Sequence, residues 1–183
     1  YSYDDCMNAS KSIVINGGNI YCYSSGNDGV DSNGTLTITG GTIVSIGTTS
    51  PEEGFDCDQN TFKITGGTIL GIGGGTSTPT SSVCTQRTLL SIQGSDQVMS
   101  YTIPRAYSQM TLLFSSSKLA SGTTYTIYTG GSVTGGTEFY GLTVGGTYTT
   151  GSQVATFTPS SMVTSVGNVS SGGPGGGGGG WHW

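Results

Sequence analysis

"NDGVDSNGTLTITGG" (residues 27–41) and "PEEGFDCDQNTFKITGG" (residues 51–67) are two versions of one pattern. Each has an acidic turn, then residues that alternate between apolar and polar, then a Gly-Gly pair. A fainter copy lies upstream, over residues 5–18. A unit of this length cannot bury its apolar face alone, but it can when it stacks on its neighbours. The pattern therefore predicts a parallel β-solenoid in which each copy forms one rung.

Four positions of the unit are apolar in every copy, and we expect them to stack as columns inside the solenoid. These columns are Met7, Val30 and Phe55; Ile13, Leu36 and Phe62; Ile15, Ile38 and Ile64; and Ile20, Ile43 and Ile69. Side chains along a strand point to alternate faces, so the residues between the second and third columns should point outward. These residues are Val14, Thr37 and Lys63.

The chain divides into three regions, all of them β or irregular. Residues 1–94 carry the repeats and are predicted to form the solenoid; whether residues 81–94 form a fourth rung stays open. Residues 95–169 lack the period and contain short β-like segments between Gly and Pro turns, which predicts an antiparallel cap or small sandwich. Residues 170–183 are a glycine-rich tail that ends in Trp-His-Trp. The predicted fold class is all-β.

Composition excludes two classes of partner and favours one location. Only 8% of the residues are charged, and five Lys and Arg cannot make the basic surface that nucleic-acid phosphates require. No apolar run approaches the length of a membrane span. The chain begins at Tyr1 inside a repeat, so we expect an upstream segment to be missing. Four cysteines in a chain rich in Ser, Thr and Gly favour a secreted or cell-surface protein.

The four cysteines are expected to form disulfides, because their spacing matches no zinc motif. We predict the pairs Cys57–Cys84 and Cys6–Cys22, since the members of each pair lie about one rung apart in sequence. Each bond would contribute about 2 to 4 kcal/mol to stability.

Acidic and amide side chains form three further columns in the predicted register. They are Asp5, Asp28 and Glu53; Asn8, Asp31 and Asp56; and Ser10, Asn33 and Asp58. Rungs lie about 4.8 Å apart, so two stacked carboxylates repel by about 3 to 4 kcal/mol. Ca²⁺, which takes about six to eight oxygen ligands, would offset this repulsion. The alternative is that these side chains only stabilise turns through hydrogen bonds to the backbone.

Aromatic residues supply the remaining candidates. Tyr21 and Tyr23 fall on one predicted strand and could stack on sugar rings, although exposed tyrosines are also common on β-proteins without a ligand. His182 is the only histidine and lies in the tail, so the rest of the chain has no Ser-His-Asp or Cys-His arrangement. Ordering a glycine-rich tail is entropically costly, so we expect Trp181 and Trp183 to be assembly residues that pack on a neighbouring subunit. The alternative is that they pack in a groove along the solenoid of the same chain.

The two acidic copies resemble a known family. Residues 28–41 and 52–67 are similar to secreted bacterial β-helix proteins described as carbohydrate-binding domain-containing proteins, and the resemblance covers about residues 3–94. It implies a right-handed, pectate-lyase-like parallel β-helix that holds Ca²⁺ and binds cellulose or pectic acid. The family's calcium ligands map onto Asp28, Asp31, Glu53, Asp56 and Asp58. The first copy departs from the family pattern at Cys6 and Asn8, which argues against a metal site there.

These features favour a noncatalytic, calcium-stabilised polysaccharide-binding protein or adhesin outside the cell. Lyases related to the family use a basic residue beside calcium, and here Arg87 and Arg105 lie outside the acidic columns. The alternative is a structural subunit of a self-assembling extracellular fibre, joined through an open solenoid end and the glycine-rich tail. Expected partners are a polysaccharide of cellulose or pectic type, copies of the chain, or both, with no nucleic acid and no membrane span.

Overall fold

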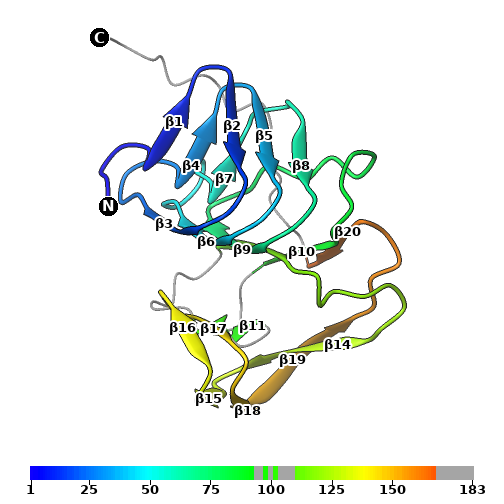
Figure 1. Cartoon of the computed structure of the whole chain (residues 1–183). Coiled ribbons are helices and arrows are strands. Elements are labelled where there is room, and N and C mark those ends of the chain that lie inside the picture. Colours follow the sequence, from blue (N-terminus) through cyan, green and yellow to red (C-terminus); the bar gives the residue numbers. More distant parts are fainter. Residues whose placement is uncertain (93–96, 99–100, 103–109, 168–183) are drawn as a thin grey trace.

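The computed structural model describes residues 1–92, 97–98, 101–102 and 110–167. These residues form β-strands and turns, and no helix occurs among them, which confirms the predicted all-β class. The sheets are of both kinds, parallel in the first part of the chain and largely antiparallel in the second (Figure 1). The glycine-rich tail with Trp181 and Trp183 lies outside the described residues.

Three parallel sheets are built from the three copies of the repeat. The strands of the first copy are β1 (Met7–Ala9), β2 (Ser12–Ile15) and β3 (Asn19–Tyr23). Those of the second are β4 (Val30–Ser32), β5 (Thr35–Ile38) and β6 (Thr42–Ile46), and those of the third are β7 (Phe55–Asp56), β8 (Phe62–Ile64) and β9 (Thr68–Gly73). Equivalent strands pair in the orders β1-β4-β7, β2-β5-β8 and β3-β6-β9. The chain therefore passes through the three sheets in turn, three times.

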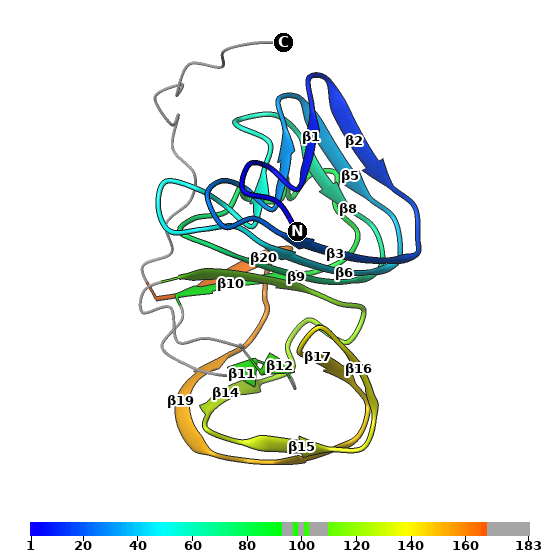
Figure 2. The same ribbon diagram turned by 90° about the vertical axis from the view of Figure 1, so that its left-hand side faces the viewer.

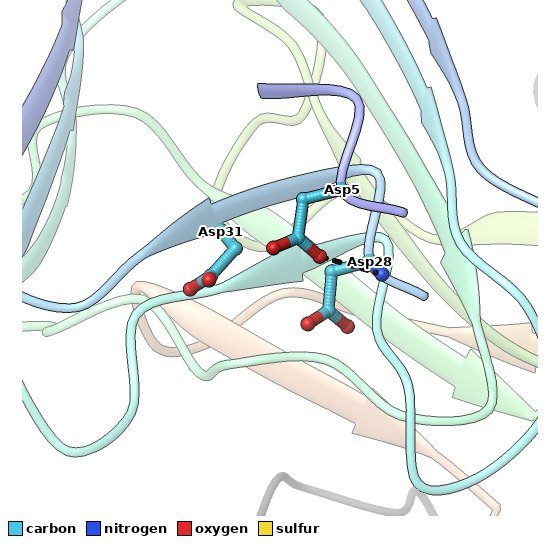
Figure 3. Close-up of side chains that lie close together, drawn as sticks. All are labelled: Asp5, Asp28 and Asp31. Carbon is cyan, nitrogen blue, oxygen red and sulfur yellow. Dashed lines mark hydrogen bonds between the residues drawn. The ribbon is translucent and has the colours of Figure 1, made fainter. Parts of the chain in front are cut away.

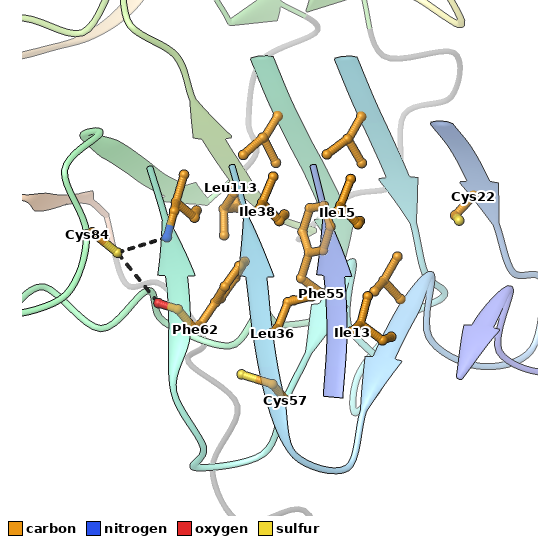
Figure 4. Packing of buried hydrophobic residues seen from close by; sticks show 14 of the residues in the cluster. Ile13, Ile15, Cys22, Leu36, Ile38, Phe55, Cys57, Phe62, Cys84 and Leu113 are labelled. Atoms are coloured by element: carbon orange, nitrogen blue, oxygen red, sulfur yellow. Dashed lines mark hydrogen bonds between the residues drawn. The ribbon is translucent and has the colours of Figure 1, made fainter. Parts of the chain in front are cut away.

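The four predicted apolar columns are confirmed as backbone partners. Ile15 pairs with Ile38 and Ile38 with Ile64, and the other three columns pair in the same way. Leu36, Ile38 and Ile64 are fully buried members of the core that the three sheets enclose. Figure 4 shows Leu36 and Ile38 in this core. Val14 of β2 points the other way and is 58% exposed, as period-two alternation requires.

The third sheet continues beyond the repeats to six strands. Its order is β20-β10-β13-β9-β6-β3, with β10 at Thr88–Ile92, β13 at Thr111–Ser115 and β20 at Val163–Val166. β13 pairs antiparallel with both β9 and β10, and β20 pairs parallel with β10. The described part of the possible fourth rung, residues 81–92, therefore adds no parallel strand beside β9, because β13 takes that place.

The second half of the chain also forms an antiparallel sheet of its own. Its order is β16-β17-β12-β11-β14-β19, and a separate pair is β15-β18. The strands are β11 (Gln97–Val98), β12 (Tyr101–Thr102), β14 (Tyr125–Thr129), β15 (Ser132–Thr134), β16 (Thr137–Phe139), β17 (Leu142–Val144), β18 (Thr147–Thr149) and β19 (Ser152–Phe157). Figure 2 shows these strands curling below the six-stranded sheet.

The six-stranded sheet separates two apolar cores. Side chains on one face, such as Ile43 and Ile69, join the core between the three parallel sheets. Their neighbours Val44 and Leu70 point to the other face and pack with Phe114, Ile127 and other residues of the second half. All of β13 is buried, because both of its faces are covered. The two halves of the chain therefore share one sheet.

Candidate metal centre

Three aspartates from two neighbouring copies of the repeat come together beside β4 (Figure 3). One carboxylate oxygen from each of Asp5, Asp28 and Asp31 lies within 4.8 Å of the others. Asp5 precedes β1, Asp28 lies in the turn before β4, and Asp31 lies in β4. The turn packs closely on the next copy, where a Cβ at Gly29 would lie 2.9 Å from the Gly54 carbonyl oxygen. Glycine at position 29 thus permits the close approach of this turn to the third copy.

Hydrogen bonds link these carboxylates to the next copy and to each other. The Asp28 amide donates to Asp5 Oδ1 at 3.2 Å, and the Glu53 amide donates to Asp28 Oδ1. Asn8 Nδ2 donates to Asp5 Oδ2 at 2.7 Å and to Asp31 Oδ2 at 2.6 Å. The acids therefore stabilise turns through hydrogen bonds, as the alternative to calcium binding predicts. Their charges nevertheless remain close together.

The third copy holds further acids in a different arrangement. Asp56 Oδ1 accepts hydrogen bonds from the Asp58 amide at 2.7 Å and from Ser77 Oγ at 3.2 Å. Asp58 has a backbone φ of 52°, a left-handed conformation that Asp tolerates in turns. Glu53 is only 4% exposed, and its Oε2 atom has no hydrogen-bond partner among the described residues. This buried carboxylate oxygen is therefore an acceptor that receives no hydrogen bond from the described residues.

Burial and mutual repulsion favour the protonated form of these acids. The pKa of Asp28 is raised to about 7, first by burial and then by Asp56, against a lowering by the Glu53 amide. Burial and the neighbouring Asp5 charge raise the pKa of Asp31 to about 7. Burial and Asp56 raise the pKa of Glu53 to about 8, against a lowering by hydrogen bonds from Ser77. Near neutral pH the group is therefore costly to ionise without a cation.

The sequence predicted this group in part. Among the five predicted ligands, the structure brings Asp28 and Asp31 together, whereas Glu53, Asp56 and Asp58 do not join the three-carboxylate group. Asp5 takes part although the first copy departs from the family pattern, and Asn8 bridges two of the carboxylates. The aligned columns contained the signal, because Asp5 occupies the position of Asp28 one copy earlier.

The predicted disulfides are not formed: all four cysteines are free thiols. Cys84 Sγ lies 3.3 Å from the Ile64 amide and 3.5 Å from the Phe62 carbonyl oxygen, whereas Cys57 Sγ lies 3.7 Å from the Asn60 carbonyl oxygen. Cys57 and Cys84 therefore face different backbone groups. A sequence spacing of about one copy does not determine the direction in which either side chain points.

The second predicted pair also consists of free thiols, although its members are neighbours. Cys6 and Cys22 are within hydrogen-bonding contact, and burial, followed by this contact, raises the pKa of Cys22 to about 12. The prediction was wrong about the bond and right about the proximity.

Tyr21 and Tyr23 lie on β3, as the sequence predicts, but Tyr21 is partly covered. Its ring stacks on that of Tyr140, with centroids 3.8 Å apart. The ring of Tyr1 lies 5.5 Å from Tyr21 and 5.7 Å from Tyr23. Any ligand of this surface would therefore meet Tyr1 and Tyr140 as well, which come from segments that the repeat pattern does not include.

Comparisons with known proteins identify no family or relative for this chain. No protein-family model matches the sequence, and no curated protein and no solved structure is similar to it. Within the described part of the chain, no helix is long and apolar enough to cross a membrane.

Proposed function

We propose that this chain is a noncatalytic, calcium-stabilised protein that binds polysaccharide outside the cell. The observation that carries the proposal is the convergence of Asp5, Asp28 and Asp31, within 4.8 Å of one another. Three carboxylates at this separation repel one another unless they are protonated or share a cation. The donors are all oxygens, which hard divalent cations such as Ca²⁺ prefer.

The architecture proposed for residues 1–94 is a right-handed parallel β-helix. In-register pairing of three successive copies supports it, as does the regular order in which the chain visits the three sheets. In such a fold every turn between strands recurs once per copy, so acids at one turn position form a column. The proposed calcium site is a consequence of this stacking.

The noncatalytic reading rests on the surroundings of the acids. Burial and neighbouring acids dominate the pKa shifts of Asp28, Asp31 and Glu53, and no Lys or Arg from the described part of the chain is among their main causes. A base that abstracts a sugar proton must lie within hydrogen-bond reach of that proton, and in related lyases it works beside calcium. The group is therefore better suited to hold an ion than to transfer a proton.

The polysaccharide and the location come from the resemblance and from composition. The low content of charged residues and the composition rich in Ser, Thr and Gly support a secreted or cell-surface location, and the family that the repeats resemble binds cellulose or pectic acid. A secreted or cell-surface location also supplies the millimolar calcium that a site with few ligands needs.

Thermal melting with calcium and with a chelator tests the cation. At a calcium concentration of 100 times its Kd, one site adds about 2.7 kcal/mol, or about 5 to 10 °C in Tm for a chain of this size. Asp31→Asn should abolish this shift, whereas Glu138→Gln, which neutralises an exposed acid in the turn-forming β16 segment, should preserve it. An unchanged Tm of the wild-type chain after chelation would leave the acids as turn formers only.

A second function is favoured by the edge strands of the parallel sheets. β1, β2 and β3 are each the last strand of their sheet, and Figure 1 shows them on the same side of the molecule. Among the described residues, only a bridge between Ser2 and Ser24 continues the pairing past this end. Such edges accept strands from other chains, so we propose a fibre subunit as the alternative. Electron microscopy of the purified protein tests it: filaments support assembly, and single particles at all concentrations oppose it.

A further inference from the structure

Four aromatic rings meet where the two halves of the chain touch. Tyr21 of β3 and Tyr140 stack with an interplanar angle of 2° and a centroid distance of 3.8 Å. Tyr1 packs edge-on against Tyr21, and Phe139 packs edge-on against Tyr140 at 5.1 Å. These contacts join the N-terminal segment, the outermost parallel strand and the β16–β17 hairpin into one aromatic surface.

Tyr140 is held in this surface against its local preferences. Tyr140 and Gly141 form the two-residue turn between β16 and β17, with φ values of 46° and 88°. Turns with two positive φ angles favour Asn-Gly, and a bulky side chain at the first position is uncommon. The nearly parallel rings are also closer than the offset arrangement that aromatic pairs prefer. Unfavourable geometry of this kind tends to persist where a residue serves a function.

The surface combines open ring faces with grouped hydroxyls. Tyr1 is 83% exposed and Tyr140 is 48% exposed, whereas Tyr21 and Tyr23 are half-buried beneath them. Burial, and then the neighbouring Tyr1, Tyr23 and Tyr140, raise the pKa of Tyr21 to about 12. The Tyr21 phenol therefore stays protonated over the physiological pH range and can donate and accept hydrogen bonds.

Exposed ring faces beside hydroxyl groups are suited to binding sugar rings. A sugar ring has an apolar C–H face, which packs on an aromatic ring, and hydroxyls at its rim, which bond to other hydroxyls. The rings that contact Tyr21 are those of Tyr1 and Tyr140, and the chain carries a net charge of −5. An acidic polysaccharide would find little to neutralise it here.

We propose that Tyr1 and Tyr140, held in place by Tyr21, bind the sugar rings of an uncharged polysaccharide. This inference rests on the proposed polysaccharide binding and restricts it, by excluding pectic acid as the ligand of this surface. The proposed calcium site is built from other residues, Asp5, Asp28 and Asp31, so binding at the tyrosines does not require the metal to touch the sugar.

Affinity electrophoresis of the full chain tests the proposal. Gels contain hydroxyethyl cellulose, which is uncharged, or polygalacturonate, which is acidic. Tyr140→Asn removes one ring and places in the turn a residue that suits it, and Tyr1→Ser removes the other exposed ring. Tyr3→Asn is the matched control, because Tyr3 is 82% exposed and its ring stacks on no other ring among the described residues. Melting temperatures of the variants show that each one folds.

The expected result is retardation of the wild-type chain by hydroxyethyl cellulose, with unchanged binding in Tyr3→Asn. Loss of either ring in the surface should weaken binding about 2- to 10-fold. Equal retardation of wild type and Tyr140→Asn would overturn this site and leave the proposed function standing. Retardation by polygalacturonate alone would overturn the choice of an uncharged ligand. If no polysaccharide retards the wild-type chain, the proposed function itself fails.

A second copy of the chain is the competing occupant of the surface. Light scattering distinguishes it: a lower mass for Tyr140→Asn with unchanged retardation would make the surface an interface between copies and overturn the proposal.

Discussion

At the scale of single residues, Asp28 shows how one carboxylate serves both sequence hypotheses. Its Oδ1 atom accepts the Glu53 amide, which fixes the turn, and its charge lies beside Asp5 and Asp31. A turn-forming side chain would ordinarily face solvent, yet Asp28 is 7% exposed. The turn contact thus brings with it a buried charge that a cation or a proton must offset.

The raised pKa values predict the pH dependence of the metal-free protein. Asp28 and Glu53 have pKa values of about 7 and 8 in the folded chain, against about 4 for an unfolded one. The folded state therefore binds more protons between pH 4 and 8, and stability falls as pH rises through this window. We expect a higher Tm at pH 5 than at pH 8 in chelator.

Calcium and substitution provide the controls for this pH dependence. Calcium binds the ionised carboxylates, so it should reduce the difference between pH 5 and pH 8. Asp28→Asn, which cannot ionise, should reduce it in chelator as well. A Tm that rises from pH 5 to pH 8 in chelator would contradict the raised pKa values.

The residue scale also shows what the sequence could not reveal. The Asp5, Asp28 and Asp31 positions follow from the repeat, because register alone places them in neighbouring columns. The Tyr21–Tyr140 stack joins residues that are far apart in the chain and have no shared period, so no local pattern predicts it. The direction of the Cys84 thiol is likewise set by a loop outside the repeat.

At the scale of elements, the repeats were predictable and the strands that extend them were not. β1 to β9 follow from alternation and from a period of one copy, since each apolar column must stack to be buried. β13 carries five buried residues in a row, so its sequence does not alternate and predicts neither an inward face nor the strand with which it pairs. Its place between β9 and β10 is decided by nonlocal antiparallel pairing, which displaced the possible fourth rung.

Substitution in β5 tests the columns directly. Ile38 is fully buried between Ile15 and Ile64, so Ile38→Ala should lower the free energy of unfolding by about 2 to 5 kcal/mol. Val14, at 58% exposure on the neighbouring strand β2, is the control, and Val14→Ala should have little effect. Denaturant unfolding measures both variants. Similar losses at the two positions would contradict the inward and outward assignment.

At the scale of the whole molecule, the shared six-stranded sheet ties the two halves into one structure. The inner core uses one face of β3, β6 and β9, and the outer core uses the other. If the six-stranded sheet unfolds, apolar surface of both cores is exposed. The sequence suggested a separate cap, because the loss of the period at about residue 95 marks a change of pattern and not the end of a core.

Two adjacent residues of β9 test this coupling. Ile69 and Leu70 are both fully buried, but Ile69 faces the inner core and Leu70 the outer core. Truncation of either one to Ala should cost about 2 to 5 kcal/mol. If the halves unfold together, both variants shift one calorimetric transition, and its van't Hoff and calorimetric enthalpies agree. Because the two side chains have the same number of atoms and are equally buried but occupy opposite faces, each variant is the control for the other. Two transitions, with Leu70→Ala lowering one and Ile69→Ala the other, would instead show that the second half folds on its own and uses the sheet only as a surface to dock on.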